Sequence, residues 1–149
     1  MKVPRGLVAD LIPFSWVDGP GNRSTVFLQG CNFDCKACHN PQTIARESVH
    51  ARRMGVAELL AELRLTAPYI SGVTVSGGEA TEQPEFLAAL FAAIKADAQL
   101  GRLTCFIDSN GSASAQTWLR MQSNYDLAQA LKSESKIRVR RYRGTAVAA

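Results

Sequence analysis

The chain of 149 residues contains no apolar run close to the ~20 residues that a helix needs to cross a bilayer. We therefore expect no membrane-spanning helix and no membrane partner. Lys2 and Arg5 lie near the N-terminus, but Asp10 and Pro13 interrupt the apolar stretch that follows, so we expect no signal peptide. The length fits one domain with a core of its own.

Cysteine is also scarce, with four in the chain and none between residues 41 and 104. This gap excludes a second cysteine-based metal site or an additional cluster in that stretch. Three of the four are grouped in one short segment, and reduced, clustered cysteines favour a reducing compartment, so we expect a cytoplasmic protein. Cys105 lies in an apolar strand, and we interpret it as a small core residue.

The net charge of +4 comes from one end of the chain. Six of the 17 basic residues and only one of the 13 acidic residues lie between 130 and 143, so the remainder is close to neutral. A basic end of this kind can bind nucleic acid. We favour a solvated helix or a disordered end, and we do not expect a nucleic-acid partner.

Cys31, Cys35 and Cys38 form the pattern C-x-x-x-C-x-x-C. Three thiolates in one loop can hold three irons of a cubane cluster and leave the fourth iron open for chemistry. One alternative is a zinc site completed by His39, although adjacent ligands rarely reach the same ion. A set of disulfides fits an odd group of three poorly.

The apolar pattern predicts alternating strands and helices after an irregular segment over residues 1–24. Strands are predicted at 24–28, 72–75 and 103–107, and helices at 54–66 and from Pro84 to about residue 94. The helical stripes are Val56, Leu59, Leu60 and Leu63, and then Leu87, Leu90, Phe91 and Ile94. This order is typical of an α/β fold with a parallel sheet and right-handed crossovers.

Each of three polar motifs follows the end of a predicted strand: the cysteines, then Ser76-Gly77-Gly78-Glu79, then Asp108-Ser109-Asn110-Gly111. Active sites are built at this edge of α/β sheets, so the motifs are expected to converge. Gly77 and Gly78 would let the backbone approach a small polar ligand, and Glu79 adds a carboxylate for a cationic amine. Tight turns are the alternative interpretation of both later motifs.

These residues resemble the radical S-adenosylmethionine superfamily, and within it the glycyl-radical-enzyme activating enzymes of the pyruvate formate-lyase type. Within this group, the residues of these motifs look most similar to those of the YjjW-type activases. The resemblance covers about residues 7–111. It rests on Trp16 to Gly21, Phe27 to Pro41, Val73 to Ala80 and Asp108 to Gly111.

The resemblance implies a partial (βα) barrel of the radical SAM type in which only the first half is clearly present. Residues 1–111 would be the core, with a cluster loop at 29–41, and residues 112–149 a divergent polar and basic tail, helical or disordered. A helix at 116–131 and a short edge strand at 137–140 are the elements expected in the tail.

The resemblance also implies the site. Cys31, Cys35 and Cys38 would ligate a [4Fe-4S] cluster. The residues expected to contact S-adenosylmethionine are Ser76, Gly77, Gly78, Glu79, Asp108 and Asn110. Asp18 and Gly19 match the segment that contacts a partner's glycine loop.

The implied reaction is activation of a glycyl-radical enzyme. A flavodoxin or ferredoxin would supply an electron, S-adenosylmethionine would be cleaved, and hydrogen would be taken from a glycine of the partner. No later half of a barrel is evident after Gly111. One alternative is therefore an inactive, truncated remnant that still binds a [4Fe-4S] cluster. A small zinc protein that binds nucleic acid is another.

Overall fold

The computed structural model describes residues 4–111, 119, 122–123, 126–127 and 129–131. The strands are β1 (Arg5–Ser15), β2 (Arg23–Leu28), β3 (Arg52–Gly55), β4 (Gly72–Gly77) and β5 (Thr104–Ile107). The helices are α1 (Val56–Thr66) and α2 (Pro84–Ala96), with short 3-10 turns η1 (Pro41–Thr43), η2 (Ala67–Tyr69) and η3 (Ala80–Glu82).

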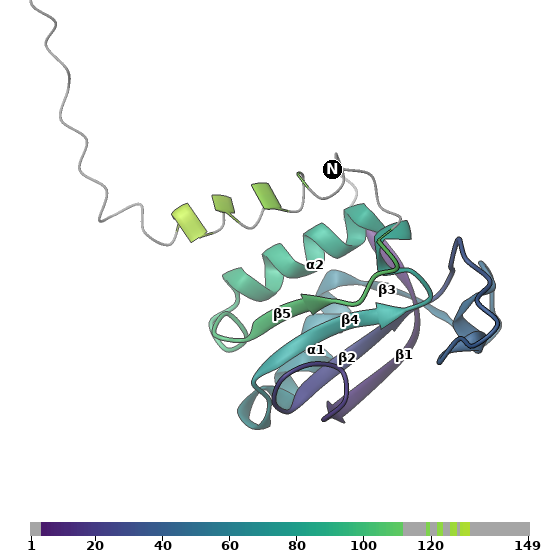
Figure 1. Ribbon diagram of the computed structural model, residues 1–149. Helices are drawn as coiled ribbons and strands as arrows, with labels where there is room; N and C mark the ends of the chain where they lie inside the picture. The colour runs from purple at the N-terminus through teal and green to yellow at the C-terminus, as the bar shows by residue number, and fades with distance from the viewer. Residues whose placement is uncertain (1–3, 112–118, 120–121, 124–125, 128, 132–149) are drawn as a thin grey trace, which may run out of the picture.

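One five-stranded sheet, in the order β3-β1-β2-β4-β5, organises the described part of the chain (Figure 1). β2, β4 and β5 are parallel, and α1 and α2 lie in the connections between them. These are the three strands and two helices that the apolar pattern predicts, so the α/β prediction is confirmed. Their carboxyl ends lie at one edge of the sheet, where the cysteine loop begins.

The prediction of an irregular segment over residues 1–24 is wrong for its first half. β1 occupies Arg5–Ser15 and pairs antiparallel with both β2 and β3, so the sheet is mixed rather than purely parallel. Its pairing with β2 shifts register between Val8 and Asp10 and again between Ile12 and Ser15. These shifts accommodate the two strand-breaking residues, Asp10 and Pro13, within a continuous strand.

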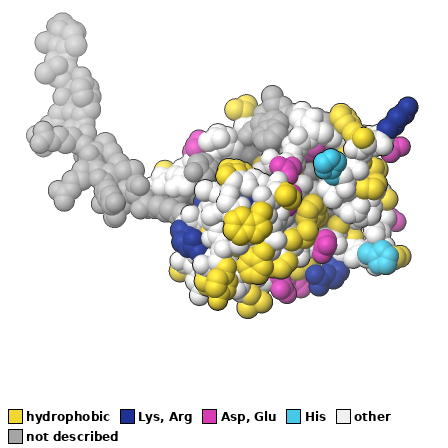
Figure 2. Space-filling model, turned by 60° about the horizontal axis from the view of Figure 1, so that its bottom comes forward, with side chains coloured by type: hydrophobic (Ala, Val, Ile, Leu, Met, Phe, Trp, Pro, Cys, Tyr) yellow, Lys and Arg dark blue, Asp and Glu magenta, His cyan; other side chains and the backbone are white. Residues whose placement is uncertain are grey.

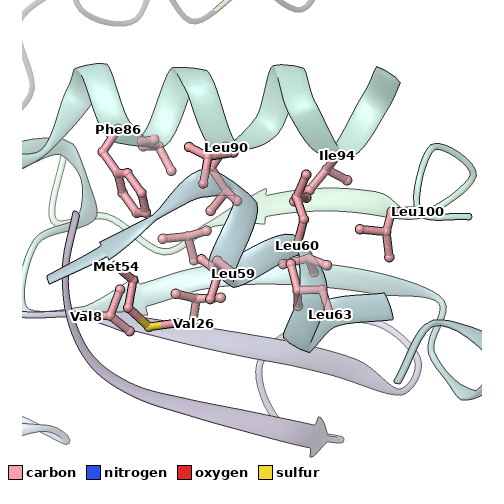
Figure 3. Packing of buried hydrophobic residues seen from close by; sticks show 14 of the residues in the cluster. Val8, Val26, Met54, Leu59, Leu60, Leu63, Phe86, Leu90, Ile94 and Leu100 are labelled. Carbon is pink, nitrogen blue, oxygen red and sulfur yellow. The ribbon is translucent and has the colours of Figure 1, made fainter. Parts of the chain in front are cut away.

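The core lies between one face of the sheet and both helices (Figure 3). Val26, Leu28, Val73 and Val75 point into it from alternate positions of β2 and β4. The predicted α1 stripe and, from α2, Leu87, Leu90 and Ile94 are all buried; Phe91 is partly buried against them. Cys105 also packs against this core, which confirms its interpretation as a core residue.

The opposite face of the sheet, which we call the inner face, carries polar side chains at the alternating positions. Arg23, Thr25 and Thr74 are fully buried there, although they lie on the side without helices. What covers them is the loop between β1 and β2, whose Asp18 bonds to both Thr25 and Thr74. Phe106 of β5 lies on the same face and is 39% exposed.

Within the predicted helix at 116–131, each residue that the structure describes is helical, and Gln122 donates to Asp126 at 2.7 Å. The predicted strand at 137–140 and the basic residues from 132 onward lie outside the described residues. In the part of the chain that the structure describes, no helix combines the length and hydropathy that a bilayer crossing requires.

Candidate functional site

The cysteine loop leaves β2 at its carboxyl end, and its two ends are tied together by backbone hydrogen bonds. The N–H of Gly30 donates to Thr43 at 2.8 Å, and that of Cys31 donates to Ile44 at 3.0 Å. The side-chain amide of Gln29 adds bonds to the carbonyls of Gln42 and Ala45. The loop is therefore anchored at its base, while the stretch that carries the cysteines has no regular secondary structure.

All three cysteines of the motif are free thiols. Cys35 is exposed, and Cys31 and Cys38 are partly exposed. The backbone N–H of Phe33 donates to the Sγ of Cys31 at 3.4 Å, and the N–H of Cys38 donates to the carbonyl of Cys35 at 3.2 Å. Hydrogen bonds to thiolate sulfur are one of the ways in which a protein tunes an iron–sulfur cluster.

The donor chemistry of this loop fits an iron–sulfur cluster. Three accessible thiols lie within eight residues, and cysteine sulfur is the usual protein ligand of iron–sulfur clusters. Among the described residues, no three Cys, His, Asp or Glu side chains are already close enough to hold a metal ion. The anchored base and irregular tip of the loop leave the three thiols room to gather around a cluster.

The sequence predicts that Gly77 and Gly78 let the backbone approach a ligand closely. In the structure, both glycines closely approach other segments of the protein backbone. A Cβ on Gly77, whose φ is +119°, would lie 2.2 Å from the Leu28 carbonyl oxygen. A Cβ on Gly78 would lie 2.2 Å from the carbonyl oxygen of Gly30. The N–H groups of Gly78 and Glu79 bond to those same two carbonyls, at 3.0 and 2.8 Å. The glycines therefore allow the end of β4 to pack on the base of the cysteine loop.

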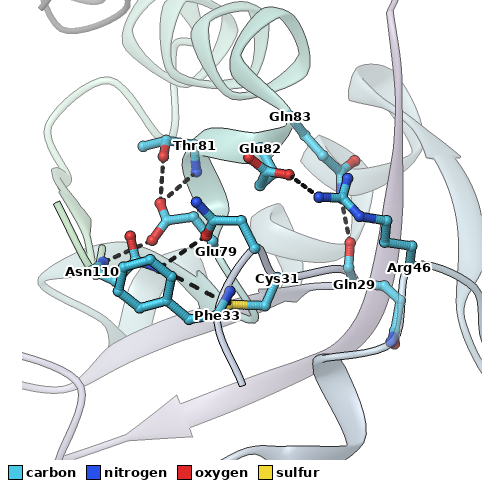
Figure 4. A network of polar contacts seen from close by, with 10 residues as sticks. Gln29, Cys31, Phe33, Arg46, Glu79, Thr81, Glu82, Gln83 and Asn110 are labelled. Atoms are coloured by element: carbon cyan, nitrogen blue, oxygen red, sulfur yellow. Dashed lines mark hydrogen bonds and ion pairs between the residues drawn. The ribbon is translucent and has the colours of Figure 1, made fainter. Parts of the chain in front are cut away.

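Glu79 is fully buried, and both of its carboxylate oxygens accept hydrogen bonds (Figure 4). Oε1 accepts from the backbone and hydroxyl of Thr81 and from the hydroxyl of Ser109 at 2.9 Å. Oε2 accepts from the backbone N–H of Asn110 at 2.7 Å. Glu79 thus ties the loop after β4 to the loop after β5.

The pKa of Glu79 is the balance of opposing effects. Burial raises it, but the hydrogen bonds from Thr81, Asn110 and Ser109 outweigh burial and lower the pKa below the ordinary value of 4.5. The carboxylate is therefore ionised at neutral pH, without a cation among its hydrogen-bond partners.

The three loops after β2, β4 and β5 meet as predicted. The side-chain amide of Asn110 donates to Asn32 at 3.0 Å and reaches the Sγ of Cys31 at 4.0 Å (Figure 4). Asp108 is exposed at this edge. Ser76 is 8% exposed, at the end of β4 on the inner face. Direct contact of Ser76, Gly77, Gly78, Glu79, Asp108 or Asn110 with a cofactor remains a prediction.

Asp18 and Gly19 do not lie at the edge with the cysteines. The carboxylate of Asp18 accepts from Ser15 at 2.5 Å and from Thr25 at 2.9 Å, both through Oδ2. Thr25 lies three residues before the end of β2, so this contact is about 10 Å short of the edge, at 3.3 Å per residue. Gly19 adopts φ +123° beside Arg23 and Phe106.

Large apolar side chains are exposed around that loop. Phe14, Trp16, Val17 and Tyr69 are between 47% and 89% exposed, and Phe14 packs edge-on against Tyr69. Figure 2, which brings the bottom of the Figure 1 view forward, shows hydrophobic side chains grouped on this side of the molecule. The loop is therefore bordered by an apolar surface.

Gln83 also belongs to the site, although the sequence gives no signal for it. The amide of Gln83 donates to the carbonyls of Leu7 and Gln29 and accepts from the N–H of Leu7 at 2.7 Å. It thereby joins β1, the end of β2 and the start of α2. Figure 4 shows the bond between Gln83 and Gln29. Nearby, Arg46 forms an ion pair with Glu82 at 2.9 Å, and both residues line a small cavity of about 210 Å³.

Several known proteins are similar to this chain. A glycyl-radical enzyme activating enzyme of Haemophilus influenzae is 46% identical over 101 residues, which are 68% of this chain and 37% of that protein. Pyruvate formate-lyase-activating enzymes of Streptococcus mutans and Staphylococcus aureus are each 43% identical, over 60% and 66% of this chain and 35% and 39% of theirs. The chain thus spans little more than a third of the length of these relatives.

The fold is also found among solved structures. The crystal structure of QueE from Escherichia coli superposes with a TM-score of 0.59 at 17% identity, covering 74% of this chain and 55% of that one. Residues 17–135, which include the three cysteines and both of the loops that meet them, match the family described as the 4Fe-4S single cluster domain. The chain belongs to this 4Fe-4S single cluster domain family.

Proposed function

We propose that this chain is the cluster-binding part of a radical enzyme that uses S-adenosylmethionine to abstract hydrogen from a glycine of a partner glycyl-radical enzyme. The names of the relatives that match at 43–46% identity support this activity. The observation that carries the proposal is the junction of the three loops, in which Glu79 and Asn110 connect the glycine-rich loop, the 108–111 loop and the cysteine loop.

Cys31, Cys35 and Cys38 would hold the cluster. When bound, a [4Fe-4S] cluster with one open iron supplies an electron to S-adenosylmethionine and a place for its polar end to bind. Ser76, Asp108 and Asn110 present polar groups at the same edge, with Asp108 exposed to solvent. Because Glu79 has both oxygens engaged, its part in cofactor binding would be to hold the Asn110 loop in place.

The partner would approach along the inner face of the sheet. Oδ2 of Asp18 is occupied by two hydroxyls, whereas its Oδ1 has no hydrogen bond from the described residues. That oxygen can accept a backbone N–H of a partner's glycine loop. A flavodoxin or ferredoxin in a reducing cytoplasm would supply the electron, in keeping with the free cysteines.

The test is anaerobic reconstitution with iron and sulfide, followed by reduction with dithionite in the presence of S-adenosylmethionine. Formation of 5′-deoxyadenosine and methionine is the expected result, and a glycyl radical detected by electron paramagnetic resonance after adding pyruvate formate-lyase would identify the acceptor class. A bound cluster without S-adenosylmethionine cleavage would contradict the proposal. It would favour the alternative of a chain that binds a cluster without cleaving S-adenosylmethionine.

We expect each single substitution, Cys31→Ala, Cys35→Ala or Cys38→Ala, to remove most of the bound iron and sulfide. A cubane cluster with only two protein thiolates is poorly held. Cys105→Ala is the matched control, since Cys105 packs against the core, away from the loop. Iron and labile sulfide per chain would be measured after anaerobic desalting. Retention of iron by all three single variants would contradict the assignment of the ligands.

A further inference from the structure

Arg23 is a fully buried arginine at the start of β2, and among the described residues no carboxylate accepts a hydrogen bond from it. Its guanidinium makes five hydrogen bonds to uncharged oxygens, which come from Thr74, Pro20, Thr104 and the carbonyl of Val73. The group also stacks over Phe106, 4.2 Å from the ring centroid. Burial lowers its pKa, and nearby acidic groups, among them Asp108, partly offset this.

The side chain of Arg23 occupies space that is open because two of its neighbours are glycines. A Cβ on Gly72, the neighbour of Arg23 in β4, would lie 2.3 Å from Nη1 of Arg23. A Cβ on Gly19 would lie 3.0 Å from Cδ of Arg23 and 3.2 Å from the Phe106 ring. Burying a charged group costs free energy unless hydrogen bonds satisfy it. The buried guanidinium of Arg23 therefore depends on the oxygens that surround it.

The hydrogen bonds lead from Arg23 to the loop between β1 and β2. Nε of Arg23 donates to the hydroxyl of Thr74 at 2.7 Å, and that hydroxyl donates to the carbonyl of Asp18 at 2.6 Å. Nη1 of Arg23 donates to the carbonyl of Pro20 at 3.2 Å. Arg23 is thus connected to the loop at two points on either side of Gly19.

We propose that Arg23 and Thr74 are positioning residues that fix the backbone of residues 18–20, and with it the free Oδ1 of Asp18, for binding an acceptor peptide. The inference rests on the proposed function for the identity of the acceptor. The link between Arg23 and the 18–20 backbone rests only on the hydrogen bonds of Arg23 to Thr74 and Pro20 and of Thr74 to Asp18. Because Nε donates to Thr74, the Thr74 hydroxyl has its proton available for the Asp18 carbonyl, which sets the direction of the chain of hydrogen bonds.

Thr74→Val removes the hydroxyl and preserves the shape of the side chain, so it tests the connection without removing the buried charge. We expect the backbone order parameters of Asp18 and Gly19 to fall below about 0.6, from about 0.85 for a rigid backbone, in NMR relaxation of the full chain prepared anaerobically. Thr74→Ser should restore them. Thr66→Val is the matched control, because Thr66 bonds to Ser24 and Leu63 on the helical side of the sheet. Unchanged order parameters in Thr74→Val would overturn the proposal.

The activity readout separates the two steps of the proposed reaction. With pyruvate formate-lyase as the probe acceptor, Thr74→Val should raise the KM for the acceptor at least tenfold. The rate of 5′-deoxyadenosine formation without acceptor should stay within twofold of the parent chain. An unchanged acceptor KM would overturn the positioning role. If the parent chain does not cleave S-adenosylmethionine at all, the proposed function fails, and the order parameters still decide whether Arg23 and Thr74 fix the loop.

Discussion

Gly78→Ala is expected to lower the free energy of unfolding by about 3 kcal/mol, because the added methyl group has no space to occupy. Its Cβ would lie 2.2 Å from the carbonyl oxygen of Gly30 and 2.6 Å from that of Thr43. Both contacts are with backbone, which cannot rotate away as a flexible side chain would. Gly78 does not have a positive φ, so steric overlap alone accounts for the expected loss.

The same substitution should also weaken cluster binding. Gly30 and Thr43 form the base of the cysteine loop, so moving their carbonyls moves the anchor points from which the three thiols gather. Urea unfolding and iron content after anaerobic reconstitution would measure the two effects. We expect the variant to hold less than half of the iron of the parent chain.

Gly111→Ala is the matched control. A Cβ there meets nothing within 4 Å, but the residue adopts φ +77°, so its expected loss of about 1–2 kcal/mol is conformational only. Its Cβ does not touch the base of the cysteine loop, so the iron content should fall less than in Gly78→Ala. Equal losses of stability in the two variants would show that the packing of the glycine-rich loop on the cysteine loop is not the decisive feature.

The elements with regular apolar patterns could be predicted from the sequence. The stripes of α1 and α2 become buried, and the three predicted parallel strands match β2, β4 and β5 to within one or two residues. The convergence of three motifs was predictable as well, because the carboxyl ends of parallel strands share an edge.

β1 and β3 could not be predicted, since their conformation depends on pairing with strands distant in sequence. β1 contains Asp10 and Pro13, which normally end a strand, and only its register shifts against β2 accommodate them. β3 is Arg52–Gly55, where Met54 is the one buried apolar residue, so its sequence carries no alternating pattern. Both arginines of β3 are exposed, and the strand forms by pairing with β1.

The roles of charged side chains at the site were the least predictable part. Glu79 follows two glycines and suggests a ligand-facing carboxylate, but its partners Ser109 and Asn110 lie 30 and 31 residues away. Arg23 begins a strand whose other residues are uncharged, and its burial depends on Gly19, Gly72 and Thr104. Such contacts arise only when three strands are assembled.

Glu79→Gln is expected to lower the free energy of unfolding by about 2–4 kcal/mol, although the side chain keeps its size. Every group facing the carboxylate is a donor: the N–H and hydroxyl of Thr81, the hydroxyl of Ser109 and the N–H of Asn110. An amide has only one acceptor oxygen, so its NH₂ must face one of these donors in a site with no access to water. The loops after β4 and β5 should separate, and cluster retention should fall with them.

The stability that Glu79 contributes should depend on pH, and the direction follows from its lowered pKa. The folded-state pKa of Glu79 lies below the ordinary value of 4.5, so the carboxylate contributes stability that is fully present above the unfolded pKa. That contribution is lost as the pH falls through the folded pKa. The difference in unfolding free energy between the parent chain and Glu79→Gln should therefore be constant from about pH 6 to 8 and decrease below pH 4.5.

Glu85→Gln is the control, because Glu85 is exposed in the first turn of α2 and should change stability by about 0.5 kcal/mol through the helix dipole. Chemical unfolding at a series of pH values would compare the three proteins. A Glu79→Gln deficit that grows as the pH falls would mean that the folded-state pKa of Glu79 lies above the ordinary value, not below it. The fold would then favour the protonated carboxyl, which contradicts the role of the carboxylate as the acceptor that joins the two loops.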